Sequence, residues 1–356
     1  MAIPESPPDL QDTNQHYITK AHLDRFIHPE SSQQVLYPYR KGGGGCKPRG
    51  TKRLGSATNF YRQTENGELN DKLDEARKIS ETLLFSSGKR NAGALAQCTF
   101  NDDFVPSPSD RLHISAAAAF LFCGSPAQIH NTAMQALLFQ QMDLFNRLNT
   151  EEVKREYRKR HGKKADRKLK ADRNRILKGE LFADVGRKNW KQLGFMSFQV
   201  EADVIQLLLG MKMTIVDAHA SSFFLTSDNP VIRIWPSRPD KLDDEVWFPI
   251  SYRRGVYWHR RGLPDKLQLD EDKTSALNRS AIKFAYKFVF SPLPTDWVEP
   301  AAKQETHDVR WGHYESLEKV IEKARPAVGP DGQPMNDIVD LIAAMRAGSK
   351  HDILGI

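Results

Sequence analysis

Positive charge is concentrated in one short stretch of this 356-residue chain, and that stretch limits how the chain can fold. Between Val153 and Lys178 there are thirteen basic and three acidic residues, a formal charge of +10, whereas the remaining 39 basic and 42 acidic residues give −3. Apolar side chains are sparse in the stretch, so little of its surface can face a hydrophobic core. The sequence therefore predicts a slightly acidic globular body that carries one cationic element.

We expect this element to be a basic helical segment over residues 151–180, interrupted near Gly162 and ended near Gly179. Such a helix can follow a phosphate backbone, and its binding would weaken with salt because counterions are released. A solvated helix or partly disordered arm, held by pairs such as Glu156–Arg160 and Asp166–Lys170, has the same composition. The residues predicted to bind DNA or RNA are Lys154, Arg155, Arg158, Lys159, Arg160, Lys163, Lys164, Arg167, Lys168, Lys170, Arg173 and Arg175.

The compartment is predicted from features that the sequence lacks. Three cysteines without C-x-x-C spacing indicate neither a disulfide framework nor a thiolate zinc site. The first fifteen residues contain no basic and apolar signal pattern. The longest apolar runs, 114–123 and 204–211, are well short of the roughly 20 residues that a membrane span needs. We therefore expect a cytoplasmic protein without a membrane span.

The order of the predicted elements favours an α+β fold, with a helical N-terminal half packed on an antiparallel sheet. Apolar spacing predicts the helices, and runs rich in β-branched and aromatic residues predict the strands. Helices are expected at 14–28, 71–86, 110–123, 126–149, 195–209 and 276–285, and strands at 35–40, 212–219, 223–227, 231–235, 246–250, 255–260 and 287–291. We expect a disordered lead over 1–13, a single domain over 14–295 that contains the basic segment, and a helical C-terminal extension over 296–356 with helices at 316–324 and 336–347.

Several short motifs occur in an order that resembles domain-of-unknown-function family 4238, a bacterial family with no established activity. The resemblance covers roughly residues 14–293 and implies a topology more than a mechanism. The motifs are Gln15-His16-Tyr17-Ile18 with Leu23 and Phe26, a strand over 35–40 leading to Asn59-Phe60-Tyr61, Asp110-Arg111, Thr226-Ser227-Asp228-Asn229-Pro230-Val231, Phe248-Pro249-Ile250-Ser251, and Leu277-Asn278.

Two of these motifs contain the candidate catalytic residues. His16 is a candidate general base or metal ligand, because imidazole titrates near neutral pH. Asp228 and Asn229 directly follow a predicted strand, where a rigid scaffold can hold them toward a substrate or a divalent metal. The alternatives are a histidine satisfied by nearby backbone groups, and an Asp-Asn pair that caps its own turn. If strands 213–217 and 224–228 pair, Asp217 and Asp228 lie too far apart to share one ion.

Two further patterns have competing interpretations. The loop from Gly45 to Lys52 nearly matches a P-loop, but threonine precedes lysine and Pro48 removes a backbone N–H, so it favours a flexible glycine loop. The run from Arg253 to Arg261 alternates arginines with aromatic residues. That pattern suits either stacking on nucleic-acid bases or a sheet strand with arginines at its ends.

Three functions fit these patterns. The first is a nucleic-acid-interacting protein, a metal-dependent nuclease in which His16, Asp228 and Asn229 form the site, His16 and Asp228 hold the metal, and the basic segment clamps phosphates. The second is a non-catalytic nucleic-acid-binding module. The third is a toxin-type or defence-type component whose basic segment meets an acidic protein, a membrane surface or a second copy of the chain.

Overall fold

The computed structural model describes residues 14–31, 33–43, 47–58, 60, 63–65, 68–70, 72–85, 93–180, 195–234, 245–307 and 309. The chain divides into two compact units, residues 1–126 with 201–309 and residues 127–200 with 310–356. The predicted lead and the helices predicted at 316–324 and 336–347 lie outside the described residues.

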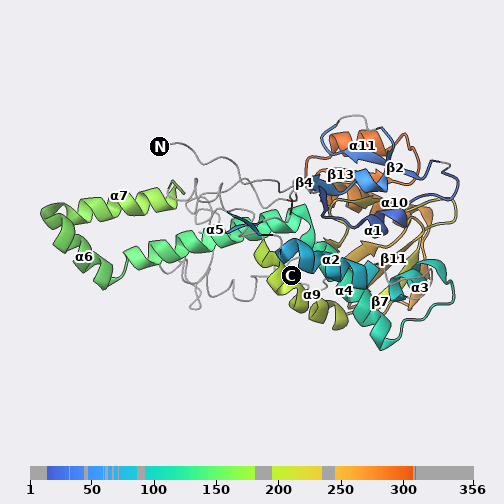
Figure 1. Ribbon diagram of the computed structural model, residues 1–356, viewed down its shortest axis with the longest axis horizontal. Helices are drawn as coiled ribbons and strands as arrows, with labels where there is room; N and C mark the ends of the chain where they lie inside the picture. Colours follow the sequence, from blue (N-terminus) through green and yellow to red (C-terminus); the bar gives the residue numbers. More distant parts are fainter. Residues whose placement is uncertain are drawn as a thin grey trace. The chain divides into compact units, whose positions relative to one another are not determined.

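The first unit confirms the α+β fold and contains two main sheets (Figure 1). A five-stranded sheet has the order β12-β7-β11-β10-β9, and a four-stranded sheet has the order β3-β2-β13-β8. All neighbouring strands are antiparallel except β12, which pairs parallel to β7. The bounds are β2 Val35–Arg40, β3 Arg49–Gly50, β7 Lys212–Asp217, β8 Thr226–Ser227, β9 Ile232–Ile234, β10 Glu245–Pro249, β11 Arg254–His259, β12 Lys266–Gln268 and β13 Phe288–Ser291.

The predicted strands are found near their expected positions, although the one expected at 223–227 is only Thr226–Ser227, and the pairing considered between 213–217 and 224–228 does not form. Strand β7 lies between β11 and β12, whereas β8 pairs with β13. Asp217 therefore ends a strand of the five-stranded sheet, and Asp228 follows a strand of the other sheet. Strand β2, far from β13 in sequence, completes the four-stranded sheet, so the local pattern could not show which strands would be neighbours.

Six α-helices of seven or more residues accompany these sheets among the described residues of the first unit (Figure 1). The longest, α4, begins with a capping box in which the Ser107 and Asp110 side chains each accept a hydrogen bond from the other's backbone N–H. Helix α4 packs against α2, α3 and α9, and α10 contacts α11, β8 and β9. The bounds are α2 Lys72–Phe85, α3 Ala94–Phe100, α4 Pro108–Gly124, α9 Glu201–Leu209, α10 Glu271–Phe284 and α11 Val298–Gln304.

The prediction of one helix over 14–28 is wrong at its start. Residues Asn14–His16 form β1, which pairs with β4 (Ser56–Thr58), and only Lys20–Asp24 form a helix, α1. Thr19 sets that start, because its side chain accepts a hydrogen bond from the His22 backbone N–H. The remaining short elements nearby are the 3-10 helix η1 (Thr51–Arg53), β5 (Gln63–Glu65) and β6 (Glu68–Asn70).

Aromatic residues of β10 and β11 form the centre of the five-stranded sheet. Trp247, Phe248 and Trp258 are almost completely buried, and the ring of Trp247 meets that of Phe224 edge-on with 4.9 Å between centroids. A Cβ atom at Gly255 would lie 2.1 Å from the Trp247 ring, so this position requires glycine. The run 253–261 is thus built mainly as a sheet strand, as one of its two interpretations predicted.

The second unit is helical over its described residues. It contains α5 (Pro126–Leu148), α6 (Glu151–His161), the 3-10 helix η2 (Gly162–Lys164), α7 (Ala165–Leu177) and η3 (Phe195–Val200). The predicted interruption is confirmed at Gly162, with φ of 53°, and the predicted end at Gly179, with φ of 73°. Among the described residues no single helix is long and apolar enough to cross a membrane, although α4 and α5 pass that test as a bent pair.

Candidate functional site

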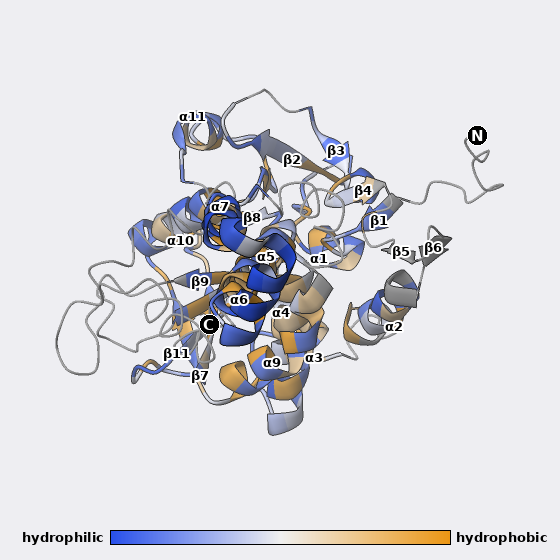
Figure 2. Cartoon of the chain, turned by 90° about the vertical axis from the view of Figure 1, so that its left-hand side faces the viewer, coloured by the Kyte–Doolittle hydropathy of each residue, from blue (hydrophilic) through white to orange (hydrophobic). Residues whose placement is uncertain are grey.

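We call α6, η2 and α7 together the basic hairpin (residues 151–177). Eleven of the thirteen basic residues between Val153 and Lys178 are exposed, and Lys154 and Arg173 are half-buried. Figure 2 shows α6 and α7 almost entirely in the colours of hydrophilic residues. The cations of the hairpin are therefore in contact with solvent, as the sequence pattern predicted.

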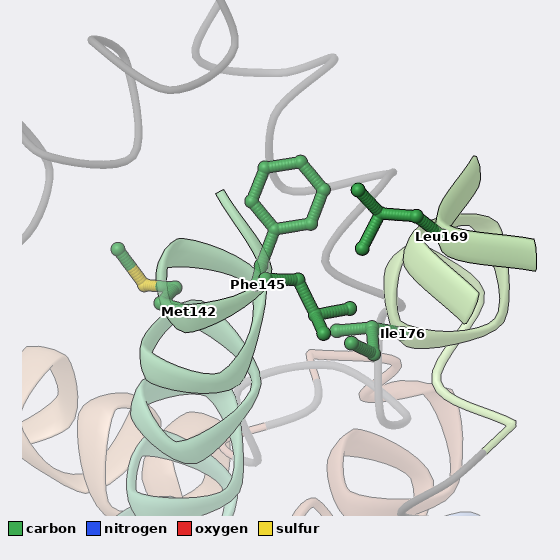
Figure 3. Close-up of a cluster of buried hydrophobic side chains, with 5 residues drawn as sticks. Met142, Phe145, Leu169 and Ile176 are labelled. Atoms are coloured by element: carbon green, nitrogen blue, oxygen red, sulfur yellow. The ribbon is translucent and has the colours of Figure 1, made fainter. Parts of the chain in front are cut away.

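A small apolar cluster holds the hairpin against α5. Met142, Phe145 and Leu148 of α5 pack with Leu169 and Ile176 of α7, and all five side chains are buried. Phe145 lies between the two helices together with Leu169 and Ile176 (Figure 3). The few apolar residues of the basic sequence are thus the ones that fix its helices in place, and this leaves the cations outside.

Polar contacts fix α6 and α7 relative to each other and to the end of α5. The Tyr157 hydroxyl donates to the Asp172 carboxylate at 3.0 Å, which joins the two helices. Arg173 donates to the Leu148 carbonyl at 3.3 Å and so fastens α7 to the end of α5. Burial is the main cause that raises the pKa of Tyr157, and its bond to Asp172 raises it further. The phenol therefore stays a hydrogen-bond donor at neutral pH.

Few cations of the hairpin have a carboxylate partner. Lys154 pairs with Glu151 at 2.7 Å, and Lys168 and Arg175 both pair with Asp172, at 3.4 and 3.8 Å. The predicted pairs Glu156–Arg160 and Asp166–Lys170 are not formed among the described residues. Between Val153 and Lys178, ten of the thirteen basic residues have no ion pair with a described residue: Arg155, Arg158, Lys159, Arg160, Lys163, Lys164, Arg167, Lys170, Arg173 and Lys178.

Cations from both helices line one cavity of about 600 Å³. Lys154 and Arg158 reach it from α6, and Lys170 and Arg173 from α7. Phe145, Leu169 and Leu177 form its apolar wall, and Asp166 is the only carboxylate among the lining residues that the structure describes. We call this cavity the hairpin groove. The sequence shows the charges but not this convergence, because the convergence depends on how α7 folds back on α6.

His16 lies in β1, beside η1. Its ring hydrogen-bonds to the Lys52 backbone, and its Nε2 atom is buried without a hydrogen-bond partner. Burial is the main cause that lowers the pKa of His16, and the nearby Lys20 lowers it further. The imidazole is therefore neutral at physiological pH. The contact with a backbone group corresponds to the alternative that the sequence left open for this histidine.

Asp228 and Asn229 directly follow β8 and bind the connection between α10 and β13. The buried Asp228 carboxylate accepts three backbone hydrogen bonds, from Tyr286 at 2.8 Å, Lys287 at 2.8 Å and Phe288 at 2.9 Å. Asn229 donates to the Phe284 carbonyl at 3.0 Å. Burial raises the pKa of Asp228 to about 7, although the three N–H groups lower it. A carboxyl group bound in this way ties the segment after β8 to the connection between α10 and β13, a long-range role that differs from the local turn cap considered as the alternative.

His16 and Asp228 have no interaction partner in common. His16 is surrounded by Lys20, Asp24 and Lys52, whereas Asp228 contacts residues 286–288. In the described ranges, no group of three or more His, Cys, Asp or Glu residues is arranged to hold a metal ion. The structure therefore gives no geometric support for the predicted metal-binding pair of His16 and Asp228.

Two arginines of the run 253–261, Arg253 and Arg254, bind groups of the sheet and of its loops. Arg254 is almost fully buried and binds the carboxylates of Asp217, at 2.5 Å, and Asp102, at 2.6 Å. Arg253 donates to the carbonyl groups of three loop residues, His219, Ala220 and Ser222. The Arg254 guanidinium is therefore not available to a nucleic acid, whereas Arg253 is exposed and only its Nη1 atom is bound to the loop.

Comparison with known proteins identifies the family of this chain. A family model described as "Protein of unknown function (DUF4238)" matches residues 14–292, more than half of the chain. Neither the curated proteins nor the solved structures gave a match. The matched range includes both main sheets, the basic hairpin and the motifs around His16 and Asp228. The chain therefore belongs to the DUF4238 family.

Proposed function

We propose that this protein binds nucleic acid, DNA or RNA, through the basic hairpin. The observation that carries the proposal is the hairpin groove, where four cations from two helices surround one cavity that contains a single carboxylate among its described lining residues. Three of the four, Arg158, Lys170 and Arg173, make no ion pair with a carboxylate of the described chain.

The charge density of the hairpin suits a phosphate backbone. A nucleic acid offers a regular row of phosphates, and each one that a cation neutralises releases a bound counterion. Arginine in particular can donate two parallel hydrogen bonds to one phosphate. Because most of the cations are exposed and unpaired, binding would not first have to break ion pairs within the protein.

The proposal is for binding, and it includes no cleavage step. Both oxygens of the Asp228 carboxylate are occupied by backbone N–H groups, and neither Asp228 nor His16 lines the hairpin groove. Cleavage at a His16–Asp228 site stays a prediction from the sequence, and the geometry favours the non-catalytic alternative.

The test measures how binding depends on salt, with the full chain. Fluorescence anisotropy with a labelled DNA duplex and a labelled single-stranded RNA would give the dissociation constant at several salt concentrations. We expect Arg158→Gln/Lys170→Gln to weaken binding and to make the slope of log K against log salt shallower by about 1.5–2, since two phosphate contacts are lost.

The matched control is Arg279→Gln/Lys283→Gln, which removes the same two residue types from exposed positions on α10. This variant should keep the wild-type slope. Equal weakening in both variants would mean diffuse attraction to net charge and would contradict a defined site. If the wild-type chain binds neither DNA nor RNA at low salt, the proposal is wrong and the hairpin serves a protein partner or a second copy.

A further inference from the structure

A larger cationic cavity lies in the first unit, at the glycine-rich loop. It has a volume of about 1120 Å³ and is formed by three segments: α1 with the residues that follow it, the turn before β2, and Lys47–Arg53 with β3 and η1. We call it the loop cavity. Its volume is that of a small-molecule binding site and exceeds the size of a bare phosphate.

Four of the cations that line the loop cavity have no carboxylate partner among the described residues. Lys47, Arg49, Lys52 and Arg53 are all exposed, and all come from one stretch of seven residues. Side chains of one charge around a hollow strengthen the potential inside it, so these four cations attract anions into the cavity.

The only carboxylate among the described lining residues, Asp24, is already bound. Lys20 pairs with Asp24 at 2.5 Å, and the Thr51 hydroxyl donates to it at 2.6 Å. Asp24 therefore holds η1 against α1 and does not compensate the four cations. The cavity keeps an excess of positive charge that nothing described in its wall offsets.

The backbone of the cavity wall is strained at one position. Gln34 has φ of 49°, and among the described residues it is the only residue other than glycine with a positive φ. Strained residues of this kind gather at ligand sites, where the surrounding structure holds them in place. The wall also contains apolar Ile27 and Pro29 and polar Ser31, so it offers more than charge to a ligand.

From these contacts we propose that the loop cavity binds a nucleoside di- or triphosphate. The phosphates would lie against Arg49, Lys52 and their two basic neighbours, and the nucleoside against the wall that contains Ile27 and Pro29. This is not a P-loop, since Pro48 and the order Thr51-Lys52 do not allow the backbone cradle of that motif. Side-chain cations supply the positive charge instead. The site is in a different unit from the basic hairpin and does not depend on it.

His16 lies next to the wall of the loop cavity. It does not line the cavity, but its ring bonds to the backbone of Lys52, which does.

Titration calorimetry on the full chain tests the proposal with three probes: ATP without magnesium, inorganic tripolyphosphate and adenosine. We expect ATP to bind, tripolyphosphate to bind more weakly and adenosine not to bind. Arg49→Gln and Lys52→Gln should each raise the Kd for ATP about tenfold or more, because a charge-assisted phosphate contact is lost. Arg279→Gln removes an exposed cation of the same unit and should leave the Kd unchanged.

Several outcomes would overturn the proposal. The first is that ATP does not bind at millimolar concentration. The second is that Arg49→Gln and Lys52→Gln leave the Kd for ATP unchanged. The third is that ATP binding is lost in Arg158→Gln/Lys170→Gln instead. Tripolyphosphate that binds as tightly as ATP would remove the nucleoside from the proposal. An oligonucleotide that needs Arg49 and Lys52 while ATP does not bind would assign the cavity to nucleic acid. Thermal unfolding checks that each variant is folded, which the exposed positions of both residues favour.

Discussion

The buried ionisable groups of the two sheets all have hydrogen-bond or ion-pair partners, as Arg254 and Asp228 show, whereas most exposed cations of the basic hairpin have no ion-pair partner among the described residues. Arg254, 5% exposed, is bound by two carboxylates and by the carbonyl groups of Cys98 and Asn101, and Asp228, 1% exposed, accepts three N–H groups. Nine of the hairpin's twelve lysines and arginines have no ion pair within the described chain. Folding removes the first set from water and must satisfy it, whereas the second set stays hydrated. Partnered charges therefore maintain the fold, and unpartnered charges are free to bind a ligand.

The largest effect should come from removing a buried, satisfied charge. Asp228→Ala leaves three backbone N–H groups between the end of α10 and the start of β13 without their acceptor, and we expect a loss of about 3–5 kcal/mol in the free energy of unfolding. Urea denaturation followed by circular dichroism measures it. Asp103→Ala, at an exposed loop position, is the control and should change stability by less than about 0.5 kcal/mol. If Asp228→Ala also lowered the free energy of unfolding by less than about 0.5 kcal/mol, buried partnered groups would not maintain the fold more than exposed ones do.

Within the hairpin, stability should depend on its apolar residues and not on its charges. Ile176 is 1% exposed in the cluster with α5, so Ile176→Ala should cost about 3 kcal/mol through lost burial and a cavity. Lys163→Gln, exposed in η2, should change stability by less than about 0.5 kcal/mol. Limited proteolysis, read out by mass spectrometry, would show whether cleavage between α6 and α7 rises in the first variant only. If Lys163→Gln destabilises as much, the cations also maintain the fold.

The sequence predicts features that depend on neighbouring residues, such as helix ends, and misses those that depend on contacts between distant parts of the chain, such as strand order. The break at Gly162, the end at Gly179 and the start of α5 at Pro126 were predictable because glycine, proline and apolar spacing act within a few residues. The order of the strands was not, because β2 and β13 meet across about 250 residues of chain. The prediction for 14–28 was wrong because β1 depends on its pairing with β4, which no local pattern reveals.

The same limit explains the candidate sites. Asp228 and Asn229 were predicted to follow a strand, and they do, but their hydrogen-bond partners are backbone groups of residues 284–288, more than fifty positions away. The charge of Lys47–Arg53 is visible in the sequence, although only the fold shows that α1 and the turn before β2 close a cavity around it. A run of charges predicts where an anion is attracted, and three-dimensional structure decides whether it finds a site.

The smallest expected effect concerns His22, a buried titratable group that belongs with the groups that maintain the fold. His22 is fully buried, its Nε2 lies 3.2 Å from the Thr226 hydroxyl, and its ring stacks on Phe248. Burial lowers the pKa of His22 to about 3, and Arg25 adds to that shift. In the unfolded chain the imidazole takes up a proton near pH 6.5. Between these values the unfolded state binds more protons, so stability is fully present above pH 6.5 and is lost as the pH falls.

Protonation of His22 in the unfolded chain should lower the free energy of unfolding by about 1.4 kcal/mol per pH unit, or by roughly 2 kcal/mol between pH 6.5 and pH 5. Wild type alone does not isolate it, since burial also lowers the pKa values of His16 and His259, and the raised pKa of Asp228 has the opposite effect. The measurement is therefore the difference in unfolding free energy between wild type and His22→Gln at each pH. That difference should be constant above pH 7.5 and should shrink as the pH falls from 6.5 to 5. A difference that stays constant over the whole range would mean that His22 is protonated in the folded protein, and a buried charge would then exist without a partner to balance it.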